Sequence, residues 1–287
     1  MIFDNKLNLD NQGLIEFPSS IALLNSLEQI SLYNNRLHTL PNSIWQLTHL
    51  KALNLSANQF TMLPDEIGNL IQLRTLDMNH NQLTTLPETL HNLTQLDSYL
   101  YMANNRFEII PAVVCNFDNL KYLNFSQNQL VNLPDNIGNL KNLLELRLYH
   151  NNLKSLPLSL SNLIKMREIH VMHNKLQTLP DNIGKLTDLR IMDLSDNEFT
   201  SLPVSIGNLS QLKILNLRNN LISSLPDSIG HLTNLLYLDL RNNKLSTLPE
   251  SLCQLQQLEK LDLRCNHSLK IPSWVMRLKN NGCVVLQ

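Results

Sequence analysis

Residues 73–93 read LRTLDMNHNQLTTLPETLHNL, and the spacing of leucine, asparagine and proline in this stretch decides the fold. Apolar and polar residues alternate in its first half, as they do in a short β-strand with one buried face. We therefore expect Leu76 and Met78 to point into a core. The residues that flank them, Thr75, Asp77 and Asn79, are expected to point outward.

An asparagine follows each strand at the point where the chain must turn. A buried amide both donates and accepts hydrogen bonds, so it can satisfy backbone groups that the turn leaves unpaired. Stacked copies of the repeat therefore predict a ladder of asparagines. Its members are Asn35, Asn58, Asn81, Asn105, Asn128, Asn151, Asn174, Asn197, Asn220, Asn243 and Asn266.

All 12 prolines occupy one position of the same repeat, at intervals of 23 residues except for 24 between Pro87 and Pro111. The acidic and apolar residues that follow proline are typical of a single helical or 3-10 turn. Five repeats carry a glycine near the end of this turn, and we expect the glycine to terminate it. These glycines are Gly68, Gly138, Gly184, Gly207 and Gly230.

The repeat continues from one end of the chain to the other without a linker. We therefore predict one domain over residues 1–287, built from about twelve repeats. Val284 and Leu286 continue the strand pattern and predict a partial thirteenth strand at the C-terminus.

Two departures from the repeat carry predictions of their own. Asp4 and Gln12 replace the leucine and the asparagine of the first unit, which is therefore expected to be a weak cap. One extra residue lies between Leu96 and Leu100, at the start of a strand, and has two interpretations, a β-bulge or an insertion that the fold tolerates without one.

The pattern LxxLxLxxNxLxxLPxxIGxL resembles the leucine-rich-repeat family across essentially the full length of the chain. It is similar to repeats of Ras-suppressor-type proteins and to repeat proteins of pathogenic bacteria. The resemblance implies an α/β fold, a curved leucine-rich-repeat solenoid with a parallel β-sheet on its concave face. Short helical or 3-10 turns are expected on the convex face. The family also implies protein recognition as the function.

Composition narrows the classes of partner. The net charge is −1, which gives no electrostatic reason to expect nucleic acid. No segment approaches the roughly 20 apolar residues of a membrane span, so membrane insertion is not expected. The four cysteines lack metal-binding or disulfide spacing and predict free thiols. We expect a reducing compartment, either the cytoplasm or a host cell that the protein enters without a signal peptide.

Aromatic residues are sorted between the two faces of the predicted strands. Tyrosines occupy outward positions, and phenylalanines occupy inward ones. Tyrosine is enriched at the energetic centres of interfaces, so this sorting favours a contact surface on the sheet over the alternative, the general preference of tyrosine for strands. The tyrosines are Tyr33, Tyr99, Tyr101, Tyr122, Tyr149 and Tyr237, and the phenylalanines are Phe17, Phe60, Phe107, Phe117, Phe125 and Phe199.

Outward residues at equal positions of successive repeats form lateral rows, because neighbouring strands lie about 4.8 Å apart. The rows place aromatic side chains toward one end of a central patch, apolar side chains toward the other, and Arg147 between them. We predict that this patch binds a protein partner. Its residues are Tyr99, Tyr101, Tyr122, Arg147, Tyr149, His150, His170, Met172, Ile191, Ile214 and Tyr237.

A second, charged patch is expected nearer the C-terminus. It has two interpretations, a ladder of opposite charges exposed to solvent or a docking site for an acidic segment. Its residues are Arg218, Arg241, Arg264, Asp239 and Asp262.

Two pairs of side chains are candidates for chemistry. His150 and His173 occupy equivalent positions and could share a metal or form a pH-sensitive contact, but His170 lies too far along its strand to be a third ligand. Glu145 and Glu168 resemble a carboxylate pair for acid–base catalysis, but an open sheet lacks the enclosed pocket that such catalysis needs. We predict no metal, no cofactor and no enzyme activity.

Three functions are compatible with these patterns. The first is a bacterial repeat protein that acts as a secreted effector or host-interaction factor. The second is a cytosolic adaptor of the Ras-suppressor type that binds a small GTPase or a scaffold. The third is a structural solenoid that assembles with itself, for which the C-terminal edge strand is a candidate homodimer contact.

Overall fold

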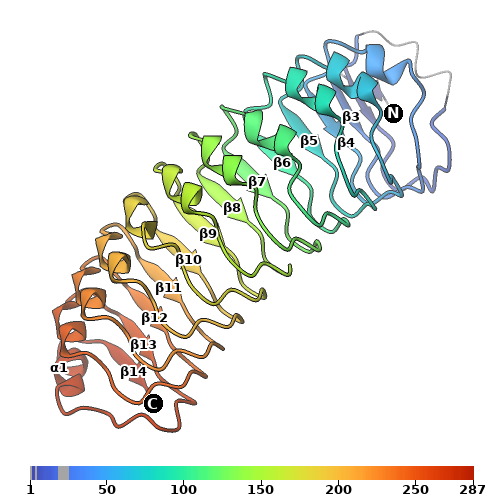
Figure 1. Cartoon of the computed structure of the whole chain (residues 1–287). Helices are drawn as coiled ribbons and strands as arrows, with labels where there is room; N and C mark the ends of the chain where they lie inside the picture. The colour runs from blue at the N-terminus through green and yellow to red at the C-terminus, as the bar shows by residue number, and fades with distance from the viewer. Residues whose placement is uncertain (1, 4, 19–25) are drawn as a thin grey trace. The chain divides into compact units, whose positions relative to one another are not determined.

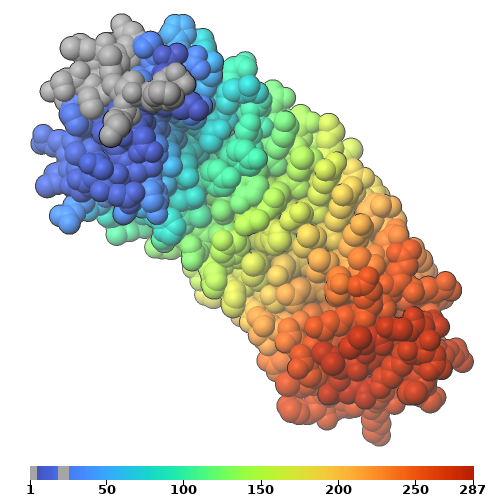
Figure 2. Space-filling view, turned by 180° about the vertical axis from the view of Figure 1, so that it is seen from behind, coloured from blue at the N-terminus to red at the C-terminus, as the bar shows by residue number. Residues whose placement is uncertain are grey.

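A computed structural model describes residues 2–3, 5–18 and 26–287. The chain forms two compact units, Met1–Leu130 (unit 1) and Val131–Gln287 (unit 2), and each is described by itself. Within each unit the strands lie side by side in one layer, and the short helical turns lie in another (Figure 1). Consecutive repeats form consecutive bands across each unit (Figure 2).

Unit 1 contains short strands that alternate with 3-10 turns. All of its strands pair in parallel except β1, which is antiparallel to β2. The strands are β1 Ile2–Phe3, β2 Lys6–Asn8, β3 Gln29–Ser31, β4 Ala52–Asn54, β5 Thr75–Asp77, β6 Tyr99–Tyr101 and β7 Tyr122–Asn124. The turns are η2 Ile44–Gln46, η3 Asp65–Asn69, η4 Glu88–Asn92 and η5 Ala112–Asn116.

Unit 2 repeats the same alternation and ends with an α-helix and a strand. Its strands are parallel throughout. They are β8 Glu145–Arg147, β9 Glu168–His170, β10 Ile191–Asp193, β11 Ile214–Asn216, β12 Tyr237–Asp239, β13 Lys260–Asp262 and β14 Val284–Leu286. The helical elements are η6 Asp135–Asn139, η7 Leu158–Asn162, η8 Ile183–Lys185, η9 Val204–Asn208, η10 Asp227–His231, η11 Glu250–Gln254 and α1 Val275–Asn280.

Leucine packing between the two layers confirms the predicted leucine-rich-repeat solenoid. Leu76 and Met78 are fully buried, whereas Thr75, Asp77 and Asn79 are half-buried on the outer side of the strand layer. We call that outer side the strand face. β14 lies where the partial thirteenth strand is predicted, and it pairs in parallel with β13. One domain over residues 1–287 stays a prediction.

The asparagine ladder is present as predicted. Asn197 Nδ2 donates hydrogen bonds to the carbonyl oxygens of Val171 (3.0 Å) and Leu194 (3.1 Å). Its Oδ1 accepts one from the backbone N–H of Leu176 at 3.0 Å. Val171 and Leu176 belong to the preceding repeat, so each asparagine side chain ties two repeats together through buried backbone groups.

The expected role of the turn glycines is wrong. Gly207 lies inside η9 and lacks the left-handed backbone of a glycine that ends a helix. A Cβ at Gly207 would instead lie 2.4 Å from the carbonyl oxygen of Ser228 in the next repeat. Glycine is therefore needed because adjacent turns pack closely. The left-handed position of the repeat precedes the ladder asparagine, as at Asp196 (φ 56°) and Ala57 (φ 53°).

Of the two interpretations of the extra residue, the structure shows the tolerated insertion and not the β-bulge. β5 and β6 pair in continuous register, with Thr75 opposite Tyr99. The extra residue is accommodated before β6, near the bend at Ser98, where the Asp97 carboxylate accepts a hydrogen bond from Arg74 at 2.6 Å. A loop that precedes the paired strand residues can hold one more residue without breaking strand pairing, whereas a bulge would leave a residue of the strand unpaired.

The first repeat departs from the ladder as its sequence predicts. Gln12 Nε2 donates to the Asp10 carbonyl oxygen at 3.0 Å, a contact within its own loop, so Gln12 does not take the ladder role. Asp4 lies outside the described residues. The antiparallel strand β1 covers β2 and was not expected from the repeat.

Candidate functional site

The strand face of each unit presents the predicted lateral rows. In unit 2 one row runs over five strands, with each residue opposite the next. It consists of Glu145, Glu168, Ile191, Ile214 and Tyr237. None of the tyrosines is buried, and the six phenylalanines at predicted inward positions are all buried, so the predicted sorting is confirmed. Partner binding by these residues stays a prediction.

In unit 1, three of the predicted residues form an aromatic cluster. The rings of Tyr99 and Tyr101 stack with centroids 5.5 Å apart, and Tyr122 contacts both of them, at 5.6 and 5.1 Å. These spacings are those of favourable aromatic pairs. Tyr99 is 45% exposed, so the cluster presents aromatic surface to solvent.

In unit 2, Arg147 is held by an acidic neighbour. Its Nε donates to Glu145 Oε1 at 2.5 Å, and His170 Nε2 lies 3.2 Å from Glu168 Oε2. Glu145, Glu168 and His170 place one ligand atom each within 4.8 Å of one another, a set that the sequence did not indicate. A metal could be held there, but Arg147 and His170 already contact the two carboxylates.

The two candidate metal ligands His150 and His173 form a stack. Their ring centroids are 4.2 Å apart and the rings are nearly parallel, at 6°. Nitrogen lone pairs in parallel planes do not converge on one ion, so this is not a chelating geometry. Burial and the neighbouring His173 lower the pKa of His150, while Asp196 acts in the opposite direction. Tyr149 packs edge-on against His150 at 5.7 Å.

The apolar part of the unit 2 surface runs from the end of β9 to β12. Met172, which follows β9, and Ile191 and Ile214, on β10 and β11, are half-buried there. A shallow hollow of about 180 Å³ borders Ile214, Tyr237 and Lys260. The Tyr237 hydroxyl donates to the Glu259 carboxylate at 2.6 Å, which raises the pKa of Tyr237. This row therefore offers apolar contact area, and the charged side chains of Glu259 and Lys260 lie beside it.

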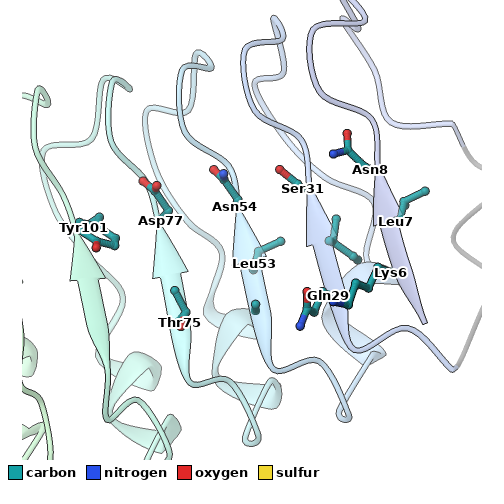
Figure 3. A pocket seen from close by; sticks show the side chains of 12 residues that line it. Lys6, Leu7, Asn8, Gln29, Ser31, Leu53, Asn54, Thr75, Asp77 and Tyr101 are labelled. Atoms are coloured by element: carbon teal, nitrogen blue, oxygen red, sulfur yellow. The ribbon is translucent and has the colours of Figure 1, made fainter. Parts of the chain in front are cut away.

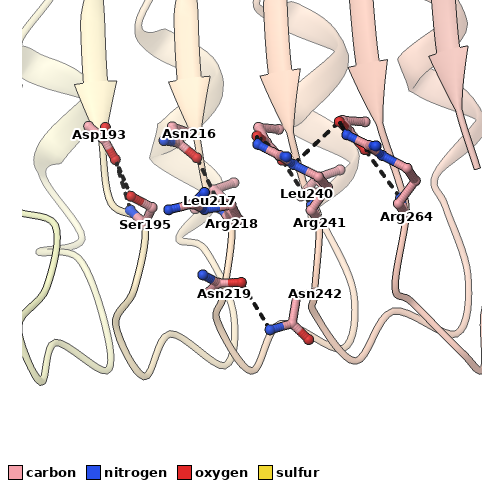
Figure 4. Close-up of polar contacts among 12 residues, drawn as sticks. Asp193, Ser195, Asn216, Leu217, Arg218, Asn219, Leu240, Arg241, Asn242 and Arg264 are labelled. Atoms are coloured by element: carbon pink, nitrogen blue, oxygen red, sulfur yellow. Dashed lines mark hydrogen bonds and ion pairs between the residues drawn. The ribbon is translucent and has the colours of Figure 1, made fainter.

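The charged patch of unit 2 is a network of ion pairs (Figure 4). Arg241 contacts Asp239 at 2.6 Å and Asp262 at 3.3 Å, and Arg264 contacts Asp262 at 2.7 Å. Burial raises the pKa of Asp262, but the hydrogen bonds from Arg264 and the charge of Arg241 outweigh burial and lower it overall. Arg218 does not join this network through Asp239. It pairs with Asp196 of the preceding repeat at 3.1 Å.

One surface feature was missed by the sequence interpretation. A groove crosses the strand face of unit 1 from β2 to β6, and only Tyr101 among its lining residues was predicted (Figure 3). Short side chains at outward positions, such as Ser31, Ala52 and Thr75, are the signal that could have located it. Among the described residues, no helix is long and apolar enough to cross a membrane.

Family models for leucine-rich repeats match most of the chain. A model described as leucine-rich repeat region matches residues 43–113, 108–198, 158–235 and 189–280. A second, described as leucine rich repeat, matches residues 26–47. A comparison with curated proteins gave no match.

Solved structures of repeat proteins are similar to this chain. A leucine-rich-repeat protein of Leptospira interrogans has 32% identity, covers 97% of this chain and 83% of its own, and gives a TM-score of 0.68. An internalin of Listeria monocytogenes, at 22% identity, 99% and 86% coverage and a TM-score of 0.74, shows the fold alone. The ectodomain of the Arabidopsis receptor kinase HAESA, in complex with the peptide hormone IDA, has 28% identity, 86% and 47% coverage, and a TM-score of 0.65.

Proposed function

Because the chain belongs to the leucine-rich-repeat family, we propose that it is a non-catalytic recognition module that binds a protein partner on its strand face. The sorting of the aromatic residues carries this proposal. Tyrosines lie on the strand face, whereas phenylalanines fill the core. An exposed tyrosine offers a large contact area to a partner and loses little side-chain entropy when it is bound. In unit 2 the half-buried row of Ile191 and Ile214 adds apolar area beside charged groups.

A finer assignment is a bacterial protein that acts as an effector or host-interaction factor. The similarity to the Leptospira interrogans protein supports it. The cysteines are free, and Cys115 and Cys283 are buried, which fits a reducing compartment such as the cytoplasm of the source organism or of a host cell.

Affinity capture with matched variants tests the strand face. The variant Ile191→Ser/Ile214→Ser changes apolar side chains on the strand face of unit 2. The control Leu158→Ser/Val204→Ser makes similar changes on the helical turns, where these side chains are 65% and 73% exposed. A partner identified by mass spectrometry in lysates of the source organism or a host should be lost with the first variant and kept with the control. The reverse pattern would overturn the proposal.

A second copy of the chain is a further candidate partner, at the edge strand β14. Val284 on this strand is 57% exposed, and an exposed strand edge offers backbone groups for pairing. Light scattering over a range of concentrations should then detect a dimer. A monomer at every concentration would contradict this contact.

A further inference from the structure

The groove on the strand face of unit 1 has a volume of about 350 Å³. Its lining comes from five neighbouring strands, mostly from their outward positions, so it runs across the sheet (Figure 3). The lining residues with outward side chains are Lys6, Asn8, Gln29, Ser31, Ala52, Asn54, Thr75, Asp77 and Tyr101.

The groove exists because its central side chains are short and those at its ends are long. Ser31, Ala52 and Thr75 form a low floor, and Tyr101 rises at one end with its ring stacked on that of Tyr99. Lys6 lies at the other end. An extended backbone can approach such a floor closely, which longer side chains would prevent.

Hydrogen bonds orient the polar groups of the floor. The Oδ1 of Asn54 accepts from the backbone N–H and the hydroxyl of Ser56, at 2.9 and 2.6 Å, so its NH₂ group is the one turned to an occupant. The Oδ1 of Asp77 accepts from the backbone N–H of Asn79 at 2.9 Å, and its second oxygen is the one that can bind a cation.

Asp77 and Tyr101 together form a subsite for a positive charge. They are opposite each other in the pairing of β5 and β6. A cation bound by the Asp77 carboxylate would therefore lie beside the neighbouring Tyr101 side chain, and aromatic faces attract cations. Burial raises the pKa of Asp77, and it outweighs the hydrogen bond from the Asn79 N–H and the charge of His80, which lower the pKa. A bound cation would therefore stabilise the ionised form of this carboxylate.

The other end of the groove carries the opposite charge. Lys6 is exposed on β2, three strands from β5. Three strand spacings, together with the offset along the strand, separate Lys6 from Asp77 by about 14–16 Å. An extended chain covers that distance in four or five residues.

We propose that the groove binds an extended segment of a partner protein, with an arginine or lysine on Asp77 and Tyr101 and an acidic residue four or five positions away on Lys6. The proposal rests on the proposed recognition function and names the chemistry of one ligand. The complementary charges at the two ends fix the register of the segment, while the small residues between them accept varied side chains.

Selection from a displayed library of random nine-residue peptides on the whole protein tests this. The wild-type protein should enrich peptides that carry a basic and an acidic residue four or five positions apart. The Asp77→Asn protein should not enrich them. The Asp65→Asn protein, with the same charge change on the exposed turn η3, should enrich them as the wild type does.

Fluorescence anisotropy with an enriched peptide then measures how much each side chain contributes to the affinity. We expect at least a tenfold loss of affinity for Asp77→Asn, two- to fivefold for Tyr101→Leu, and a weaker preference for the acidic residue in Lys6→Gln. Circular dichroism checks that each variant is folded. No enrichment, or enrichment that Asp77→Asn leaves unchanged, would overturn the groove proposal. The capture experiment on unit 2 would still test the recognition function separately.

Discussion

Replacing Gly207 by alanine separates two opposing effects on stability. Alanine is about 1 kcal/mol more favourable than glycine inside a helix, so local propensity predicts a gain. The structure predicts a loss, because the new Cβ would lie 2.4 Å from the Ser228 carbonyl oxygen and 2.8 Å from the Ser228 Cβ. Adjacent repeats must separate to relieve these contacts, because a backbone oxygen cannot turn aside as a flexible side chain can. The cost therefore lies in the upper part of the usual range for overpacking, about 2–3 kcal/mol. We expect a net decrease in the free energy of unfolding of about 1–2 kcal/mol.

Urea unfolding followed by far-ultraviolet circular dichroism measures this change. Ser161→Ala is the matched control, since Ser161 occupies the same position of another repeat and already carries a Cβ. It loses one hydrogen bond, from its hydroxyl to the Leu158 carbonyl oxygen, and should change stability by less than about 1 kcal/mol. A Gly207→Ala protein as stable as the wild type, or more stable, would refute the packing argument.

Three further outcomes follow from the fold. Asn197→Ala should destabilise by about 1–3 kcal/mol in the same urea assay, because it leaves the backbone N–H of Leu176 unpaired in the core. The carbonyl oxygens of Val171 and Leu194 each lose one of two hydrogen bonds and keep those from Asn174 and Asn220. Ala57→Asn should stabilise by about 0.5–1 kcal/mol, since asparagine tolerates the left-handed backbone better, and an unchanged melting temperature would contradict this. Burial raises the pKa of Cys115 to about 12, so a thiolate-directed reagent at pH 8 should label exposed Cys265 in the native protein and reach Cys115 only after unfolding.

The sequence predicted the features that depend on the period of the repeat. The alternation around Leu76 and Met78 placed the strands and their buried faces, and the asparagine positions predicted the ladder. Lateral rows on the strand face followed from the same period. Such features recur in nearly every copy, so one mistaken repeat would not have changed them.

The errors concern contacts between repeats, which local patterns do not reveal. The position of Gly207 in the repeat predicted the end of a turn, but glycine is required there because Ser228 of the next repeat leaves no room for a Cβ. Arg218 was predicted to share one charged patch with Asp239 and Asp262, yet its side chain pairs with Asp196 of the preceding repeat. The groove of unit 1 arises from side chains that are short, and an interpretation that searched for aromatic and charged residues passed over them.

The most direct test of strand-face recognition uses the tyrosines as reporters. Tyr99 and Tyr237 lie on the strand faces of units 1 and 2, 45% and 40% exposed. Met62 and Met276 are 65% and 55% exposed outside the strands. Hydroxyl-radical footprinting with and without a captured partner should show slower oxidation of one or both tyrosines and unchanged oxidation of the methionines. Unchanged tyrosines with protected methionines would contradict recognition on the strand face.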